Sequence, residues 1–443
     1  MATCILLNLC KSVCKRDFQV ATDWYNGVMD DLVANIISFY LDSRDFNGLP
    51  IYEPDEIDVD AASELVRQGL VQVVSDEDYM NPHIRPWASR RSIEDQVDSL
   101  QRIKKNEYMV CLYPTAATMK DYDFGDRYKD RPYHRRMAEG KGTLELAFFR
   151  YDVLEPYRND PRFVFRFNDY GVDIWLNDDL YIDESEPEAD KTAIDHVGFA
   201  YDLSKFDKDD PDSEIRRLVC AFYVDLCKLN SAHQLRWSTY EVEPGPDVAP
   251  HHIWWGSQMG HWPDGTGPFE RFFFELKTLN KLFADAHGVD LVSTVDRPDG
   301  LGWILRPSQS EFDSFIHQLD KLLSDNLRHK AFDELGIDRR NDADELIGSL
   351  NRLDLTLERF GVSESARSEV LEPLRNVRRL RQKPAHALRE NVTNATFVHH
   401  QASLLRDVTT SVELLRRFWQ THPANAGWKE PEHATEDARS YWL

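Results

Sequence analysis

The spacing of hydrophobic residues changes near Pro307, and this change constrains the fold more than any other feature of the sequence. After Pro307, large apolar residues recur at steps of three and four, which indicates amphipathic helices. Four helices are predicted, over residues 308–323, 342–360, 363–381 and 396–419. Ser308 or Ser310 is the expected N-terminal cap of the first one. Four helices with short links predict a bundle over about 307–421, followed by a polar tail over 422–443.

Residues 142–242 follow a shorter period that is typical of β-strands. Two strand pairs are predicted there, 162–168 with 171–176 and 218–228 with 234–242. Asp169 and Tyr170 form the turn of the first pair, and the second pair is rich in Val, Phe, Tyr and Trp. Helical spacing and acidic loops in residues 1–135 predict a small α-rich segment.

The stretch 243–268 holds many prolines and glycines, so a long loop or a boundary is expected there. A helix through Phe269 to Phe283 and a short strand over 301–305 follow it. The predicted fold class is therefore α+β. A mixed α/β region with a sensing or regulatory role covers residues 1–306, and an all-α bundle follows it.

Charge is distributed unevenly along the chain. Residues 311–443 carry 19 basic and 22 acidic side chains, so −21 of the net charge of −24 lies in the first 310 residues. A uniformly acidic surface repels nucleic acid, which excludes binding by the whole surface. Residues 374–389, however, hold six basic side chains and no acidic one. This stretch predicts a local cationic site that a phosphate-bearing ligand would neutralise.

No apolar run approaches the roughly 18 to 20 residues that a membrane helix needs, so no membrane is expected and the cytoplasm is the expected location. The six cysteines are too sparse for a disulfide framework and are expected to be reduced, mostly buried thiols. Cys4, Cys10 and Cys14 lie close together, but a fourth metal ligand is missing, so ordinary packing is the preferred interpretation.

The basic stretch contains an R-x4-H motif formed by Arg381 and His386. In a straight helix, residues five apart lie about 140° apart around the axis and do not face one site. Pro384 lies between them and is expected to end or kink the helix, which lets the two side chains converge. A second match, Arg417 to His422, lies at a helix terminus and is interpreted as a helix cap.

The sequence LRNVRRLRQKPAHAL, in the third helix of a C-terminal four-helix bundle, resembles the HEPN superfamily. Many members are metal-independent ribonucleases of bacterial toxin and phage-defence systems, and others are inactive binding modules. The resemblance covers about 130 residues, and Gln382 stands where the family more often has Asn, Asp or His. It implies a homodimer in which the two R-x4-H motifs face each other.

Metal-free RNA cleavage needs a proton shuttle and a cation that stabilises charge on phosphorus, and His386 and Arg381 suit these roles. The sequence thus predicts an endoribonuclease that uses attack by the RNA 2′-OH, with no metal or cofactor. RNA is the expected partner, and a protein or phage-derived trigger is an expected partner of the N-terminal region. The predicted RNA-binding residues are Arg375, Arg378, Arg379, Gln382, Lys383 and Arg389.

Three alternatives remain at this point. The bundle could be a non-catalytic module that binds a protein or nucleic acid through its basic helix. Asp264, Glu275 and Lys277 match the PD-(D/E)xK pattern of metal-dependent nucleases, although Glu275 lies in a predicted helix rather than a strand. His251, His252 and His261, among nearby tryptophans, could bind zinc or stack on bases, but a buried aromatic loop is preferred.

Overall fold

The chain divides into two compact units in the computed structural model. One unit comprises Met1–Phe149, Ile182–Ile194 and Cys220–Val242, and the other comprises Arg150–Tyr181, Asp195–Val219 and Glu243–Leu443. The structure describes residues 27, 29–42, 47–53, 56–75, 77–78, 91–103, 110–177, 179–180, 194, 196–205, 216–259, 267–382 and 390–429. Helices and antiparallel sheets both occur, which confirms the α+β class. No helix in these ranges is both long and apolar enough to span a membrane.

The first unit begins with a helix over residues 29–42 and a small three-stranded antiparallel sheet of order β1-β3-β2. Its elements are β1 (Leu49–Ile51), α2 (Val59–Arg67), β2 (Val71–Ser75), α3 (Ile93–Ile103) and β3 (Val110–Pro114). Ile36, Val73 and Leu112 share one buried core. The α-rich prediction missed this sheet because its strands are at most five residues long and do not alternate cleanly.

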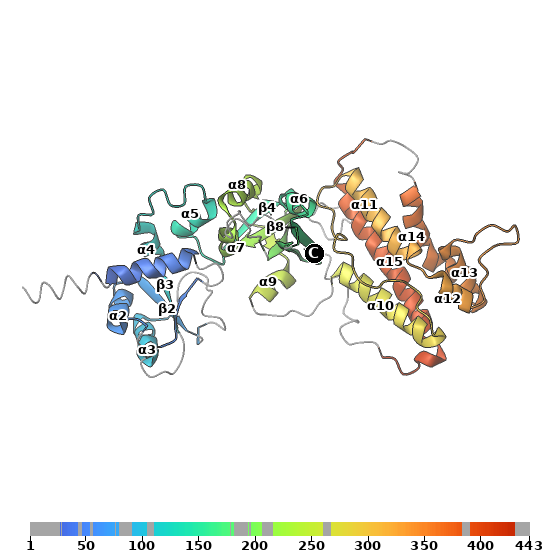
Figure 1. The fold of residues 1–443 in the computed structure, drawn as a ribbon, viewed down its shortest axis with the longest axis horizontal. Helices are drawn as coiled ribbons and strands as arrows, with labels where there is room; N and C mark the ends of the chain where they lie inside the picture. Colours follow the sequence, from blue (N-terminus) through green and yellow to red (C-terminus); the bar gives the residue numbers. More distant parts are fainter. Residues whose placement is uncertain are drawn as a thin grey trace, which may run out of the picture. The chain divides into compact units, whose positions relative to one another are not determined.

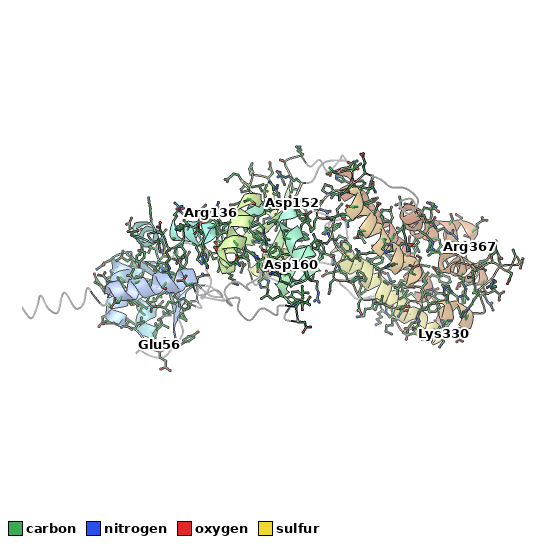
Figure 2. The ribbon with its side chains drawn as sticks, turned by 45° about the horizontal axis from the view of Figure 1, so that its top comes forward. Glu56, Arg136, Asp152, Asp160, Lys330 and Arg367 are labelled. Carbon is green, nitrogen blue, oxygen red and sulfur yellow. The ribbon has the colours of Figure 1, made fainter. Side chains whose placement is uncertain are left out.

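The rest of the first unit is mainly helical around one aromatic core. Its elements are α4 (Ala116–Asp121), α5 (Pro132–Ala138), β4 (Leu146–Arg150), α7 (Tyr223–Lys228), α8 (Ser231–Tyr240) and β9 (Glu241–Val242). Phe149 packs edge-on against Tyr133 and Trp237, with ring centroids 6.2 Å and 4.7 Å away. Arg136, labelled in Figure 2, pairs with Glu241 and ties α5 to β9.

The predicted strand pair over 218–228 and 234–242 is largely wrong. Strand β8 (Arg216–Phe222) is present, but helices α7 and α8 occupy most of the remaining residues. Asn230 explains the start of α8, because its side chain accepts a hydrogen bond from the His233 N–H at 2.8 Å. Burial of Trp237 and Gln234 then outweighs the β preference of this aromatic sequence.

Removal of the Asn230 cap should therefore destabilise the first unit. We expect Asn230→Ala to lower the free energy of unfolding by about 1 kcal/mol, because the His233 N–H loses its acceptor. Asn230→Asp is the control, since a carboxylate caps equally well. Urea denaturation followed by tryptophan fluorescence measures the difference. Equal midpoints for Asn230→Ala and Asn230→Asp would contradict this explanation of the helix start.

The second unit contains the predicted hairpin, which is confirmed as β5 (Phe163–Phe167) paired with β6 (Gly171–Leu176). Around it lie η1 (Tyr151–Leu154), α6 (Glu155–Asn159), β7 (Val197–Asp202), β10 (Val248–Pro250) and α9 (His252–Gln258). Strand β6 pairs with β7, and β10 also pairs with β7, all in antiparallel fashion.

Asp169 in the hairpin turn anchors the helical part of the second unit to the sheet. Its buried carboxylate accepts the N–H groups of Phe269 and Glu270 at the start of α10, at 2.8 Å and 3.0 Å. It also pairs with Arg297 at 2.6 Å. Gly267 allows this contact, because a Cβ there would lie 2.1 Å from Asp169 atoms.

Helices make up most of the second unit after Gly267. They are α10 (Pro268–His287), α11 (Gln309–Asp320), a π-helical turn η3 (Lys321–Asp325), α12 (His329–Glu334), α13 (Ser349–Arg359), α14 (Glu364–Gln382), α15 (Thr396–Gln420) and η5 (Pro423–Asn425). Helices α11, α14 and α15 lie side by side (Figure 1). Ser308 caps α11 as predicted, by accepting the Glu311 N–H.

The helix predicted over 342–360 starts later than expected, at Ser349. Asn341 explains the difference, because its side chain accepts the N–H groups of Ala343 and Glu345 and holds a turn. Asp344 adopts a left-handed conformation there, with φ of 62°. Side-chain acceptors of this kind compete with helix formation.

The predicted domain boundary at 306/307 falls inside the second unit. The reason is α10, which packs along α15 through Phe283 and Trp419, with ring centroids 4.9 Å apart. The helix predicted through Phe269 to Phe283 is therefore present, but it belongs to the helical bundle. The predicted strand over 301–305 is absent, although Leu301, Trp303 and Leu305 are buried.

Candidate functional site

The last turn of α14 faces the π-helical turn that follows α11, and Arg381 is the central contact. Its guanidinium Nη1 pairs with the Asp320 carboxylate and also lies 3.3 Å from Asp325 Oδ2. The Asp320 side chain is only 1% exposed, whereas that of Arg381 is 32% exposed. A buried carboxylate therefore holds a guanidinium that still reaches solvent.

The π turn explains why two aspartates five residues apart meet one arginine. In an α-helix they would lie about 140° apart around the axis. A π turn instead bonds residue i to i+5, as the Asn326 N–H does to the Lys321 carbonyl at 2.8 Å. This wider turn brings Asp325 onto the same side as Asp320. Single π turns occur frequently at functional sites.

Both carboxylates contact the same nitrogen of Arg381, Nη1, and the opposite edge of the guanidinium, formed by Nε and Nη2, contacts neither of them. The Nε and Nη2 groups have no hydrogen-bond partner among the described residues. This edge of the rigid guanidinium fork matches two oxygens of a phosphate. Asp320 also raises the pKa of Arg381, so the guanidinium remains charged at any working pH. The arrangement can thus hold a cation in place and present it to a phosphate.

The other described arginines of the basic stretch also have acidic or polar partners. Arg375 pairs with Asp354 at 2.8 Å, and Arg379 pairs with Glu372 at 2.6 Å. The basic stretch itself contains no acidic residue, but the expectation that the charges of these arginines are not neutralised within the protein is wrong. Asp354 comes from another helix, α13, and Glu372 lies just upstream of the stretch on α14. Asp354 also pairs at 2.7 Å with Arg367, labelled in Figure 2.

Arg378 completes the described part of this site. Its Nη1 donates to Ser324 Oγ at 2.8 Å and lies 4.0 Å from both Asp320 and Asp325. Ser324 in turn donates to Asp320 Oδ1 at 2.8 Å. Asp320, Ser324 and Asp325 could not be predicted from the sequence, because a helix end gives no signal that distinguishes a π turn from an ordinary terminus.

The motif itself is only partly described. Gln382 is exposed and is the last residue of α14. His386, together with Lys383, Pro384 and Arg389, lies outside the described residues. The convergence of Arg381 and His386 therefore stays a prediction. The helix ends two residues before Pro384, where a proline is expected to stop it.

Arg417 and His422 of the second R-x4-H match make separate contacts, and the His422 ring also packs against His287 of α10, with centroids 5.3 Å apart. Arg417 pairs with Glu413, one helical turn away, at 2.5 Å. His422 accepts the Ala424 N–H at its Nδ1, 3.3 Å away, and so caps the short η5 turn that follows α15. Its position after α15 agrees with a capping role, although it caps the next turn rather than α15 itself.

Glu275, proposed for a metal-dependent nuclease, lies in α10 and is completely buried. Its carboxylate pairs with Arg416 at 2.5 Å and with Arg271 at 2.8 Å. Two guanidinium groups thus occupy the oxygens that a metal would need. Asp264, the other acid of this pattern, lies outside the described residues. Within the described ranges, no group of three His, Cys, Asp or Glu side chains is placed to hold a metal ion.

His251 takes part in packing at the start of α9. Its Nδ1 accepts the Ile253 N–H at 3.2 Å, and its ring stacks on His252 with centroids 4.9 Å apart. Burial lowers the pKa of His251 to about 4, and His252 adds to the shift. His251 is therefore neutral at neutral pH. His261 and Trp262 lie outside the described residues.

Comparison of the chain with protein-family models, with curated proteins and with solved structures gave no match. The function must therefore be inferred from the chain's own residues.

Proposed function

We propose that this chain is a metal-independent endoribonuclease in which Arg381 and His386 are the catalytic residues. The supporting observation is the anchoring of Arg381, whose Nη1 is held by Asp320 and Asp325 while its Nε and Nη2 edge faces no described partner. A preorganised cation of this kind stabilises charge that develops in a transition state without reorganising at the moment of reaction. His386 follows five residues later.

The proposed reaction is attack of the RNA 2′-oxygen on the adjacent phosphorus. The 2′-O–P bond forms and the P–O5′ bond breaks, which gives a 2′,3′-cyclic phosphate and a free 5′-hydroxyl. His386 exchanges protons with the 2′-OH or the leaving 5′-oxygen, because imidazole titrates near neutral pH. Arg381 stabilises the additional negative charge on the phosphoryl oxygens.

Arg378 and Arg379 are proposed to bind the RNA backbone beside this centre. Their side chains are 43% and 53% exposed. The partner of Arg379, Glu372, is 54% exposed, and exposed ion pairs contribute little to stability. A phosphate can therefore replace Glu372 as the partner of Arg379 at low cost.

Replacement of Arg378 and Arg379 together by glutamine should weaken RNA binding and reduce its salt dependence. Each lost phosphate contact lowers the slope of log K against log salt by about 0.7 for single strands, so we expect a decrease of up to about 1.4. Fluorescence anisotropy with a labelled single-stranded RNA over a salt series measures this slope. An unchanged affinity and slope would assign both arginines to the surface ion pairs alone.

The proposal also includes a homodimer through the C-terminal helices, as the family resemblance implies. One R-x4-H motif supplies one imidazole, whereas cleavage requires both an acid and a base. We expect a dimer in sedimentation-velocity experiments at micromolar concentration. A fully active monomer would contradict this part of the proposal.

The alternative is a non-catalytic bundle that binds a protein or a nucleic acid. The ion pairs of Arg375 with Asp354 and of Arg379 with Glu372 favour it, because an arginine that already has an acidic partner needs no phosphate to neutralise its charge. In both proposals the N-terminal region would receive a protein or phage-derived trigger. Cleavage of RNA by the purified protein distinguishes the two.

A further inference from the structure

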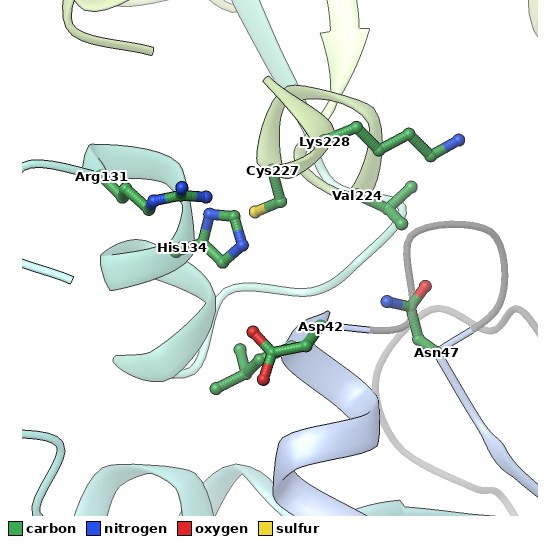
Figure 3. Close-up of a pocket in the computed structure, with 8 residues that line it drawn as sticks. Asp42, Asn47, Arg131, His134, Val224, Cys227 and Lys228 are labelled. Carbon is green, nitrogen blue, oxygen red and sulfur yellow. The ribbon is translucent and has the colours of Figure 1, made fainter. Parts of the chain in front are cut away.

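A cavity of about 200 Å³ lies in the first unit, between the helix over residues 29–42, α5 and α7. Figure 3 shows Arg131 at the start of α5, His134 from α5, Cys227 from α7, and Asp42 and Asn47 around it. Pockets for drug-sized ligands typically have about 300 to 1,000 Å³, so this one suits a smaller molecule. Its lining is mostly polar, which is unusual for a space left by imperfect packing.

The hydrogen bonds of Gln234 determine the tautomer of His134. Gln234 Oε1 accepts the Tyr133 N–H at 3.3 Å, and its Nε2 donates to the Leu229 carbonyl at 2.8 Å. The same Nε2 lies 3.0 Å from His134 Nδ1, so Nδ1 must be the acceptor. Burial lowers the pKa of His134 to about 4, and the ring is neutral at neutral pH. His134 therefore carries its proton on Nε2 and is a hydrogen-bond donor.

Arg131 places a positive charge at the cavity. No carboxylate of the described residues lies within ion-pair distance of its guanidinium. The nearest acid of the lining, Asp42, is already paired with Arg127 at 2.5 Å. Lys228 also lines the cavity, but its ammonium pairs with Asp225 at 3.0 Å and points away from His134 in Figure 3. The unpaired charge beside the cavity is that of Arg131.

Asn47 lines the same cavity and has a buried side-chain oxygen whose hydrogen bonding is incomplete. It is 2% exposed, and its Nδ2 donates to the Tyr40 carbonyl at 2.8 Å. Its Oδ1 is buried and accepts no hydrogen bond from the residues that the structure describes. A buried acceptor without a donor is destabilising, so a donor from a ligand would be stabilising.

We propose that this cavity binds a small anion that also carries a hydrogen-bond donor. Arg131 and the His134 Nε2–H would bind the anionic oxygens, and Asn47 Oδ1 would accept the donor. Hydrogen phosphate and a small hydroxycarboxylate share this chemistry. The proposal concerns the first unit and does not depend on RNA cleavage in the second.

Calorimetric titration of the full chain with two matched pairs of anions tests the proposal. Inorganic phosphate carries a P–OH donor near neutral pH and sulfate does not, and lactate carries a hydroxyl that propionate lacks. We expect phosphate to bind about tenfold or more tightly than sulfate, or lactate than propionate, because Asn47 Oδ1 needs a donor. The pair that shows the difference identifies the ligand as a phosphate or as a carboxylate. Equal affinity within both pairs, or no binding, would overturn the proposal.

Two arginine variants, one at the N-terminal cap of α5 and one within α5, test the anion contact. Arg131→Gln should weaken binding by about tenfold or more, the size expected for a lost charge-assisted hydrogen bond. Arg135→Gln is the matched control, because Arg135 is 64% exposed and pairs with Glu139 on the surface. Equal effects of the two substitutions would overturn the assignment. If Arg131→Gln does not fold, the phosphate and lactate comparisons on the unsubstituted chain still decide.

Discussion

Substitution of Arg381 by alanine is expected to reduce RNA cleavage by about 100- to 1,000-fold in kcat/KM. Removal of one preorganised donor to a developing oxyanion has an effect of this size. The fold should remain intact, because Ser324 still donates a hydrogen bond to the buried Asp320 carboxylate, Arg378 still lies 4.0 Å from it, and α14 is anchored by Leu371, Leu374 and Val377. Loss of the proton shuttle in His386→Ala should cost about 100- to 10,000-fold. Initial rates on one defined RNA measure both variants.

Three control variants make this result specific. Arg381→Lys keeps the charge but loses the planar fork, so it should restore little activity. Arg417→Ala, in the second R-x4-H match, should retain full activity. Lys277→Ala should also retain it, since Lys277 belongs to the metal-nuclease pattern and is exposed on α10. Loss of activity in Lys277→Ala with full activity in Arg381→Ala would favour the metal nuclease instead.

Substitution of Glu275 by alanine is expected to destabilise the second unit by about 3 to 5 kcal/mol. The change removes the buried carboxylate that pairs with Arg416 and Arg271, and breaking a buried ion pair costs this much. Urea denaturation followed by circular dichroism measures the loss. Glu275→Ala is consequently unsuitable as a catalytic control, because any loss of activity would reflect unfolding.

The matched control lies ten residues further along α10. Asp285 pairs with Lys281 at 2.6 Å, but the two side chains are 46% and 64% exposed. Asp285→Ala should therefore change stability by less than about 1 kcal/mol.

Burial raises the pKa of the Glu275 carboxyl even though Arg416 and Arg271 oppose the shift, so the buried pair carries a desolvation cost. Replacement of both Glu275 and Arg416 by methionine should accordingly be much less harmful than Glu275→Ala, and an equal loss would contradict this account.

The long amphipathic helices could be predicted from the sequence, because their period repeats over several turns. Helices α10, α11, α14 and α15 were all predicted to within a few residues. The short strands β2 and β3 were not, since five residues give too little periodicity. The sequence predicts strands where α7 and α8 lie, because their Val, Tyr and Trp content favours β-structure, whereas the Asn230 cap and tertiary burial determine the outcome.

The candidate site was predictable only in part. Arg381 was identified from its motif and from the basic stretch around it. Its partners Asp320 and Asp325 lie about 60 residues upstream and come together through a π turn, so no local pattern links them to Arg381. For the same reason Asp354, which pairs with Arg375 from helix α13, was not expected. Contacts between helices depend on packing, which one sequence does not reveal.

The chemistry of the product ends is the most direct test of RNA cleavage without a metal. The purified protein is incubated with RNA in excess EDTA, and the new ends are mapped. The proposed mechanism predicts cleavage that survives chelation and produces 2′,3′-cyclic phosphates with 5′-hydroxyl ends. Products with 5′-phosphates, or activity that EDTA abolishes, would contradict it and support metal-activated water as the nucleophile. A complete lack of cleavage would contradict it as well and support the non-catalytic binding module.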